Sequence, residues 1–199
     1  MLDSPYVRRV AVSLKLMGVP FEHQSLSVFR TFEQFRAINP VVKAPTLVCD
    51  DGAVLMDSTL ILDHLEERVV PEKRLMPASG AARREALRLT GLALAACEKC
   101  VQIVYEHNQR PEDKRHGPWL DRVTGQANAA FGELERAAER AAPWLQGERL
   151  DAADVMVACA WRFSQFYNAK VVPAVKYPAL VAHSERAEAL PEFLSTPLD

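Results

Sequence analysis

The chain has 199 residues, of which 49% are hydrophobic and 25% charged, a composition typical of a globular protein and not of a disordered one. Its 24 basic and 26 acidic residues give a formal net charge of -2 and no basic patch, which argues against nucleic acid and anionic membranes as partners. No apolar run is long enough to span a membrane and the start lacks a signal-peptide pattern. We therefore expect a cytoplasmic protein.

Residues 1–70 mix short helical and strand-like patterns, which is typical of α/β organisation. A helix is predicted over 5–17, because its apolar residues recur at helical spacing, Pro5 suits the first turn and Gly18 follows the end. Alternation over 21–26 predicts a half-buried strand. The other elements expected here are a helix over 31–38, a hairpin of 46–49 with 54–56 around the turn at 50–52, and a helix over 58–68.

Residues 71–80 contain two prolines around a charged group and predict a linker between two packed units. Strand patterns disappear from there on. Apolar spacing predicts one long helix through 87–105 and a second over 119–141. The fold class is thus α/β plus all-α, with an all-helical domain over 81–199.

Asp151 and Asp154 mark the start of a third long helix before the apolar run from Val155. Asp151 can accept a hydrogen bond from the first turn, and Asp154 lies at the positive end of the helix dipole. Trp161 follows on the same helix, where an aromatic side chain is typical of the core.

The cysteines and histidines favour neither a disulfide framework nor a metal site. The four cysteines are irregularly spaced, and the five histidines are dispersed without a ligand motif. Cys97 and Cys100 have C-x-x-C spacing but lie within a predicted long helix, away from a strand-to-helix turn. We expect reduced thiols and no metal.

Three motifs occur in the first half of the chain, in the order SPYVRRV at residues 4–10, NPVVKAPTL at 39–47 and DS at 57–58. Together they resemble the glutathione-binding half of the cytosolic serine-type glutathione S-transferases. The first motif resembles that of the tau and zeta types. The helical second half, with capping residues at 151–154, extends the resemblance over essentially the whole chain. It implies a thioredoxin-like βαβαββα domain followed by a helical bundle, glutathione as co-substrate, a small electrophilic or peroxidic second substrate, and a homodimer.

Ser4 has two interpretations. It can cap the first helix by satisfying an orphan backbone N–H. The resemblance implies that its hydroxyl also donates to the sulfur of glutathione and, together with the helix N-terminus, favours the thiolate. One residue can serve both purposes.

The resemblance implies that the Ala44-Pro45 peptide bond is cis and that the backbone of Ala44 holds the cysteinyl part of glutathione as an added strand would be held. On base rates alone, a trans proline that starts a strand is the commoner case. Lys43 can pair with the glycine carboxylate of glutathione or be a solvated surface residue.

Asp57 and Ser58 stand at the start of a predicted helix, where backbone N–H groups and a hydroxyl suit the γ-glutamyl carboxylate. Asp57 can accept from the adjacent ammonium group. The family more often has Glu at the position of Asp57, so this side chain is one methylene shorter. Simple N-capping is the other interpretation.

The second substrate is not readable from the sequence, because its pocket depends on the variable helical half. Tyr6, Tyr105, Asn108 and Trp161 are the candidates for contacts in the cleft where the resemblance places this substrate.

The family's first strand normally supplies about five residues in the interior of the sheet, whereas only residues 1–3 precede Ser4. Either the start is assigned too late, or the sheet tolerates a stub, or residues outside this numbering fill the gap. We expect a truncated strand to leave unpaired backbone groups and a cavity beneath the first helix. An N-terminal extension should then raise thermal stability and glutathione affinity.

A glutathione transferase is the leading functional hypothesis. A non-catalytic binding or regulatory module on the same fold is the alternative, since fold does not determine function. The joint presence of Ser4, Ala44-Pro45 and Asp57-Ser58 favours the enzyme. A zeta-type isomerase is a third interpretation, but it would have Ser-Ser-Cys in place of Ser4-Pro5-Tyr6.

Overall fold

The computed structural model describes residues 1–198, which form two compact units. The first unit comprises Met1–Leu75 together with the residues from Pro191 onward, and the second is Met76–Leu190. The segment from Pro191, which the sequence-based division places in the helical half, therefore groups with the first unit.

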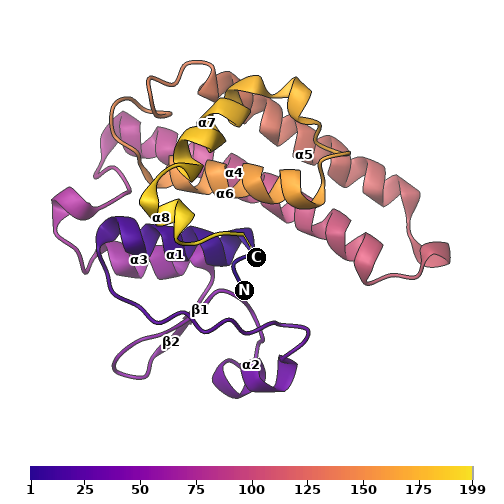
Figure 1. Ribbon diagram of the computed structural model, residues 1–199, viewed down its shortest axis with the longest axis horizontal. Helices are drawn as coiled ribbons and strands as arrows, with labels where there is room; N and C mark the ends of the chain where they lie inside the picture. The colour runs from indigo at the N-terminus through magenta and orange to yellow at the C-terminus, as the bar shows by residue number, and fades with distance from the viewer. Residues whose placement is uncertain (199) are drawn as a thin grey trace. The chain divides into compact units, whose positions relative to one another are not determined.

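In the part of the first unit that the structure describes, there are a small sheet and four α-helices. Its elements are α1 (Pro5–Met17), α2 (Phe32–Ile38), β1 (Thr46–Val48), β2 (Val54–Met56), α3 (Ser58–Glu66), the 3₁₀ turn η1 (Pro71–Lys73) and α8 (Pro191–Leu194). Helices α1 and α3 lie side by side, with the hairpin of β1 and β2 next to them, and α2 lies farther along the same unit (Figure 1).

Local sequence accounts for the first helix and the hairpin. Helix α1 has the predicted bounds and ends at Gly18, whose φ of 72° lies in the left-handed region that glycine adopts freely. Strands β1 and β2 pair antiparallel, with Leu47 opposite Leu55, around a turn in which Gly52 also has a positive φ. The predicted hairpin is confirmed.

The predicted strand over residues 21–26 is wrong. This segment is extended but belongs to no sheet, and the sheet of the described residues has only the two strands of the hairpin. A strand exists only through its neighbours, and none lies beside this segment.

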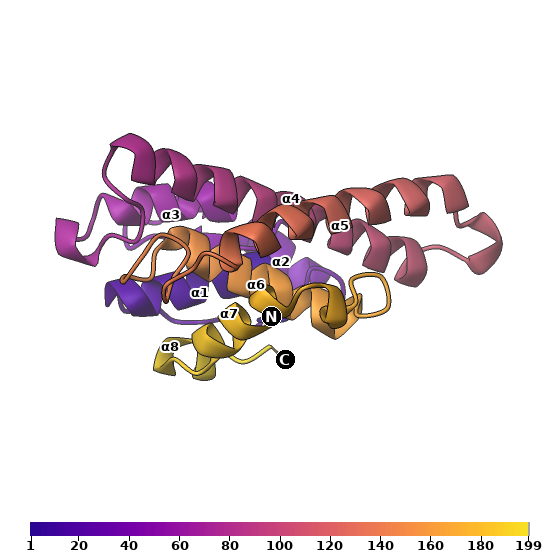
Figure 2. The ribbon, with the colours of Figure 1, turned by 90° about the horizontal axis from the view of Figure 1, so that it is seen from above.

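The second unit is helical. Its elements are α4 (Gly80–Asn108), the 3₁₀ turn η2 (Glu112–Lys114), α5 (Gly117–Ala138), α6 (Ala152–Tyr167), the 3₁₀ turn η3 (Ala174–Lys176) and α7 (Pro178–Glu188). Figure 2 shows α4 and α5 as a long antiparallel pair, and α6 packs against α4 and α7.

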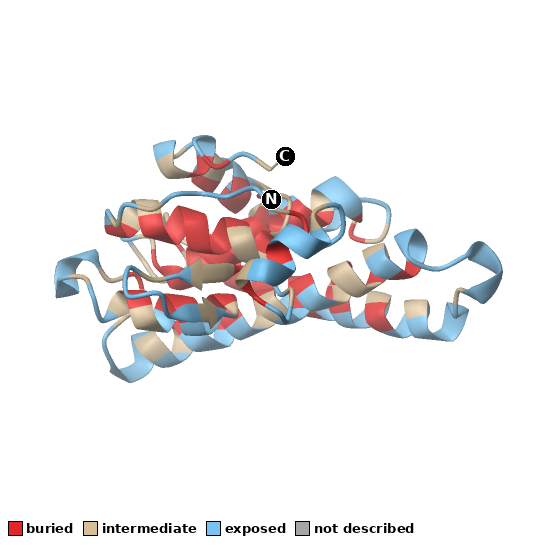
Figure 3. Cartoon of the chain, turned by 90° about the horizontal axis from the view of Figure 1, so that it is seen from below, coloured by how far each residue is buried: buried red, intermediate tan, exposed pale blue. Residues whose placement is uncertain are grey.

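Helix α6 is the centre of this unit. All residues from Ala152 to Trp161 are buried, as expected for a helix that is apolar on nearly every side. Figure 3 shows buried residues on the facing sides of the helices and exposed residues on their outer sides and in the loops. The peptide bonds before Pro45 and Pro143 are cis.

Candidate functional site

Ser4 is the N-cap of α1. Its backbone carbonyl oxygen accepts from the Arg8 N–H at 2.9 Å, and its Oγ accepts from the Val7 N–H at 3.4 Å. That second bond is long, and the hydroxyl hydrogen is not used by it. The first turn of α1 contains no acidic residue, and the N-terminus of a helix carries the positive end of its dipole.

The loop that leads to the Ala44-Pro45 bond is held by Asn39, which is only 3% exposed. The Asn39 side chain donates to Thr46 Oγ1 at 2.9 Å and accepts from the Val41 N–H at 3.0 Å. The Ala44-Pro45 bond is cis, as the resemblance implies. Asn39 thus fixes both ends of the turn that presents Ala44.

Asp57 caps α3 with a backbone in an unusual conformation. Its φ is 74°, a region that side-chain-bearing residues seldom adopt. Its carboxylate accepts from the Thr59 N–H at 2.9 Å and lies 3.5 Å from Lys43 Nζ. The structure therefore brings together the predicted Lys43 and Asp57, and both side chains are about half exposed.

Ser58 follows at the first position of α3 and is buried. Its Oγ accepts from the Arg9 guanidinium at 3.1 Å, and the same Arg9 nitrogen lies 3.1 Å from Thr59 Oγ1. Because Arg9 occupies an acceptor position of the Ser58 oxygen, the Ser58 hydroxyl keeps its hydrogen for another partner. Arg9 also connects the helix that begins at Ser4 to the helix that begins at Ser58.

The four residues expected to contact the second substrate differ in how far their side chains are exposed. Tyr105 is 44% exposed and Asn108 is exposed, and both lie on the last turn of α4, three residues apart and thus on neighbouring positions of its surface. Tyr6 on α1 is half-buried. Trp161 is 3% exposed and packs edge-on against the rings of Phe131 and Tyr177, so its position is that of a core residue.

Sequence reasoning assigned no role to Arg9 or Asn39 and did not foresee the backbone of Val42, whose φ is 53°. Arg9 and Asn39 both lie in the motifs of residues 4–10 and 39–47, and this position was the one signal in the sequence that pointed to them. A β-branched residue in the left-handed region has no signature in a single sequence.

The C-x-x-C pair has no exposed thiol. Cys97 and Cys100 are fully buried in α4, and burial raises the pKa of the Cys100 thiol to about 12. Only Cys49 among the four cysteines is partly exposed. Over residues 1–198 no group of three or more His, Cys, Asp or Glu side chains is arranged to hold a metal, and no helix there is long and apolar enough to cross a membrane.

Comparison with known proteins gives a consistent result over both units. Residues 1–73 match the family description "Glutathione S-transferase, N-terminal domain" and residues 117–186 match "Glutathione S-transferase, C-terminal domain". A glutathione transferase family member of Pseudomonas fluorescens Pf-5, solved with bound glutathione, is 31% identical, with a TM-score of 0.87 over 100% of this chain and 97% of the other.

Two further relatives extend this picture. A glutathione S-transferase of Methylobacterium radiotolerans, in complex with glutathione sulfonate, is 27% identical, with a TM-score of 0.90 over 98% of this chain and 90% of that one. Maleylacetoacetate isomerase of Pseudomonas aeruginosa is 26% identical over 155 residues, which are 74% of this chain and 71% of the isomerase.

Proposed function

Because the chain belongs to the glutathione S-transferase family, we propose that its first unit binds glutathione and holds the sulfur of this tripeptide as a thiolate for attack on a small electrophilic or peroxidic molecule. The observation that carries the proposal is the position of Ser4: a hydroxyl at the N-terminus of α1, with a hydrogen not used by its capping bond.

Holding the glutathione sulfur as a thiolate at neutral pH requires a modest stabilisation of its charged form. A thiol pKa near 8.5 has to fall by about two units for the thiolate to dominate at neutral pH, which corresponds to about 2.7 kcal/mol. A hydrogen bond to a charged group supplies about 1.5–3 kcal/mol and a helix N-terminus about 0.3–1 kcal/mol. Together the contributions of Ser4 and α1 span about 1.8–4 kcal/mol, a range that includes the required value. Ser4 itself stays protonated.

The remaining contacts recognise the rest of the tripeptide. The backbone of Ala44 pairs with the cysteinyl residue as a neighbouring strand would. The hydroxyl of Ser58 and the start of α3 receive the γ-glutamyl carboxylate, while Asp57 accepts from the α-ammonium group. Lys43 pairs with the glycine carboxylate.

The second substrate is the less defined part of the proposal. Tyr105 and Asn108 are exposed on α4 and are our candidates for contacts with it, as is Tyr6 on α1. Action as a homodimer in the cytoplasm also belongs to the proposal.

The test replaces Ser4. In Ser4→Ala we expect kcat for conjugation of an aryl halide to fall at least tenfold, because a hydrogen bond to the thiolate of about 1.5 kcal/mol or more is lost while the helix N-terminus remains. The glutathione Kd from calorimetry should change by less than about threefold. The pKa of the bound thiol, followed by the ultraviolet absorbance of the thiolate, should rise. Ser4→Thr keeps both the cap and the hydroxyl and is the matched control.

Unchanged turnover in Ser4→Ala would remove Ser4 from the mechanism. If calorimetry detects no glutathione binding to the unaltered chain, the non-catalytic module becomes the better description. Glutathione-dependent isomerisation is the second candidate, favoured by the relative named maleylacetoacetate isomerase, although Pro5 and Tyr6 stand where a zeta-type enzyme has Ser and Cys.

A further inference from the structure

An ion pair joins Lys43 and Asp57, two residues of the proposed glutathione site. Lys43 Nζ lies 3.5 Å from Asp57 Oδ2. The other carboxylate oxygen, Oδ1, accepts from the Thr59 N–H at 2.9 Å, and Thr59 lies in the first turn of α3. The protein itself therefore engages both oxygens of Asp57, one in the cap of α3 and the other in the contact with Lys43.

Local contacts hold the backbone at Lys43. The Lys43 carbonyl oxygen accepts from Thr46 Oγ1 at 2.7 Å. The preceding residue, Val42, donates its N–H to Asn39 O at 2.9 Å. The Lys43 side chain, by contrast, is 53% exposed and has a flexible four-carbon stem. Its ammonium group can therefore leave Asp57 while the fold stays unchanged.

The charges at the start of α3 are unfavourable for another cation beside Lys43. Arg9 donates to Ser58 Oγ at 3.1 Å, so the cationic side chains of Arg9 and Lys43 both contact residues 57–58. A γ-glutamyl head group carries a carboxylate and an ammonium group. If this ammonium group also bonded to Asp57, it would lie close to Lys43 Nζ and be repelled by it. Lys43 and the ammonium group therefore compete for Asp57.

We propose that Lys43 occupies the place of the ligand's α-ammonium group on Asp57 and is exchanged for it when glutathione binds. This rests on the proposed function, in which Asp57 accepts from the ammonium group and Lys43 pairs with the glycine carboxylate. The ammonium group that takes over Asp57 Oδ2 releases Lys43 for the other end of the tripeptide. Recognition of the γ-glutamyl end and recognition of the glycine end are then linked through one side chain.

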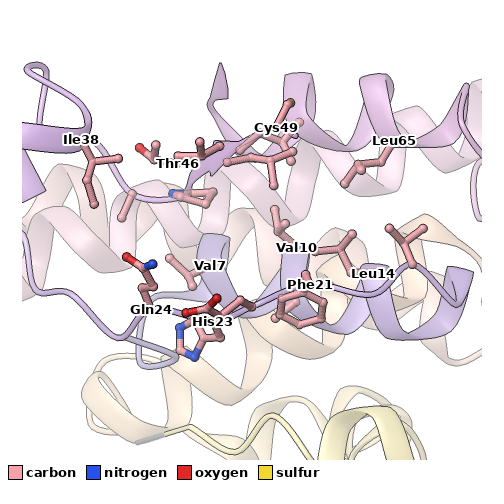
Figure 4. A pocket seen from close by; sticks show the side chains of 18 of the residues that line it. Val7, Val10, Leu14, Phe21, His23, Gln24, Ile38, Thr46, Cys49 and Leu65 are labelled. Atoms are coloured by element: carbon pink, nitrogen blue, oxygen red, sulfur yellow. The ribbon is translucent and has the colours of Figure 1, made fainter. Parts of the chain in front are cut away.

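The exchange takes place at the surface and not in the cavity of the first unit. This cavity, of about 450 Å³, has Thr46 on one side and Phe21 on the other (Figure 4). Neither Lys43 nor Asp57 lines it, and both side chains are about half exposed. Water therefore weakens their attraction. An exposed ion pair changes an equilibrium constant by up to about fivefold, which sets the size of the effect to be measured.

Two ligands that differ only in the ammonium group test the exchange. They are the S-methyl forms of γ-glutamyl-cysteinyl-glycinamide and of glutaryl-cysteinyl-glycinamide, which is the same molecule without the amino group. The S-methyl group keeps thiolate formation, and thus Ser4, out of the measurement, and the amide removes the glycine carboxylate. The full chain is titrated by calorimetry at an ionic strength of about 0.01 M, where exposed charges are little screened.

Lys43→Met keeps an apolar stem and removes the charge. It should bind the amide that carries the ammonium group about two- to fivefold more tightly than the unaltered chain does, because the competitor is gone. It should bind the deaminated amide no more tightly. S-methylglutathione, which has the glycine carboxylate, should gain less than its amide, because it also loses its contact with Lys43. Lys73→Met removes a lysine charge from the exposed turn η1 and, as the control, should bind every ligand as the unaltered chain does.

Asp57→Asn supplies a second arm of the experiment. In this background Lys43→Met should bring no gain for the amide that carries the ammonium group, because Lys43 has no carboxylate to occupy. A gain of the same size in both backgrounds would assign the competition to another residue and overturn the proposal.

Three further results would overturn the exchange. An equal gain for both amides in Lys43→Met would show a general effect of charge, and no gain for either would show that Lys43 does not compete. An equal gain for S-methylglutathione and its amide would show that Lys43 does not reach the glycine end. Binding of S-methylglutathione to the unaltered chain separates these outcomes from a failure of the proposed function: if it binds, glutathione recognition stands without the exchange, and if it does not, both fail.

Discussion

Among residues 1–198, two residues other than glycine have positive φ angles, and both adjoin predicted glutathione contacts. Val42, with φ 53°, precedes Lys43 and Ala44, and Asp57, with φ 74°, precedes Ser58. Such conformations cost on the order of 1–3 kcal/mol each and persist where the surroundings impose them, commonly at binding sites. The backbone strain at Asp57 therefore supports the assignment that the sequence motif suggested.

Replacing Asp57 by glycine should separate stability from binding. Asp57→Gly relieves the strained φ. The capping carboxylate is lost, but glycine is nearly as good an N-cap residue. We therefore expect the free energy of unfolding in urea to rise by about 1 kcal/mol. Glutathione affinity by calorimetry should fall about tenfold, because the carboxylate that accepts from the ammonium group is gone.

Asp57→Asn is the control, since asparagine retains a capping oxygen and tolerates positive φ. It should leave stability nearly unchanged and weaken glutathione binding. A loss of stability in Asp57→Gly would mean that the carboxylate supports the fold and that the strain at this position is small.

Among the elements, α6 shows the capping box that the sequence predicts. The Asp151 carboxylate accepts from the Ala153 N–H at 2.7 Å, and Asp154 accepts in return from the Asp151 N–H at 2.9 Å. The fully buried Asp154 also accepts from the Leu145 N–H and lies 2.9 Å from His183 Nε2. One helix start thus joins the preceding loop to α7.

The charge of Asp151 makes a pH-dependent contribution to stability. Burial, and then the negative charge of Asp154, raise the pKa of Asp151 above its ordinary value of 3.8. The folded state therefore binds this proton more tightly than the unfolded state. The stability that this group contributes is complete below pH 3.8 and is lost as the pH rises through the raised pKa.

Asp151→Asn keeps a capping oxygen without the charge. Relative to the unaltered protein, this variant should become more stable, with a larger free energy of unfolding, as the pH rises from below 3.8 through the raised pKa. At higher pH the difference in stability should level off. Asp151→Ala also lacks the charge, so it should follow the same pH dependence as Asp151→Asn but lie about 1 kcal/mol below it in stability at every pH, because the cap is lost. Urea unfolding over a pH series gives both curves, and a flat difference for Asp151→Asn would show that Asp151 titrates normally.

Elements that depend on nearby residues were predictable, and those that depend on distant ones were not. Helix α1, the hairpin and the start of α6 follow from spacing, turns and caps close in the chain. Residues 21–26 alternate as a strand does, but a strand forms only beside a partner. At the candidate site, the cap by Ser4 and the cis Ala44-Pro45 bond were expected from the sequence motifs and are present. The contact of Arg9 with Ser58 joins positions 49 residues apart and leaves no local pattern.

At the scale of the whole molecule, the segment from Pro191 to residue 198 belongs to the first unit. The buried Arg8 on α1 donates through Nε to Thr196 O at 2.8 Å, and its guanidinium lies 5.4 Å from the centre of the Phe193 ring. Phe193 is fully buried. The sequence offered no sign of this contact, because almost the whole chain separates its two sides.

Truncating Phe193 should therefore destabilise the first unit. Phe193→Ala removes a buried aromatic ring and should cost about 3–5 kcal/mol in urea unfolding, with faster amide exchange in α1. Leu194→Ala alters the next residue, which is 65% exposed, and should change stability by less than about 0.5 kcal/mol. Similar losses in the two variants would indicate that α8 contributes little to the unit.

The bond from Arg8 to Thr196 also has a consequence for biosynthesis. Domains ordinarily fold in the order in which they leave the ribosome, at about 5–20 residues per second. Here α1 makes this contact with a residue that is translated 188 positions after Arg8, whereas Met76–Leu190 is completely translated before that residue. We expect the nascent second unit to fold first, so the N-terminal half depends longest on chaperones.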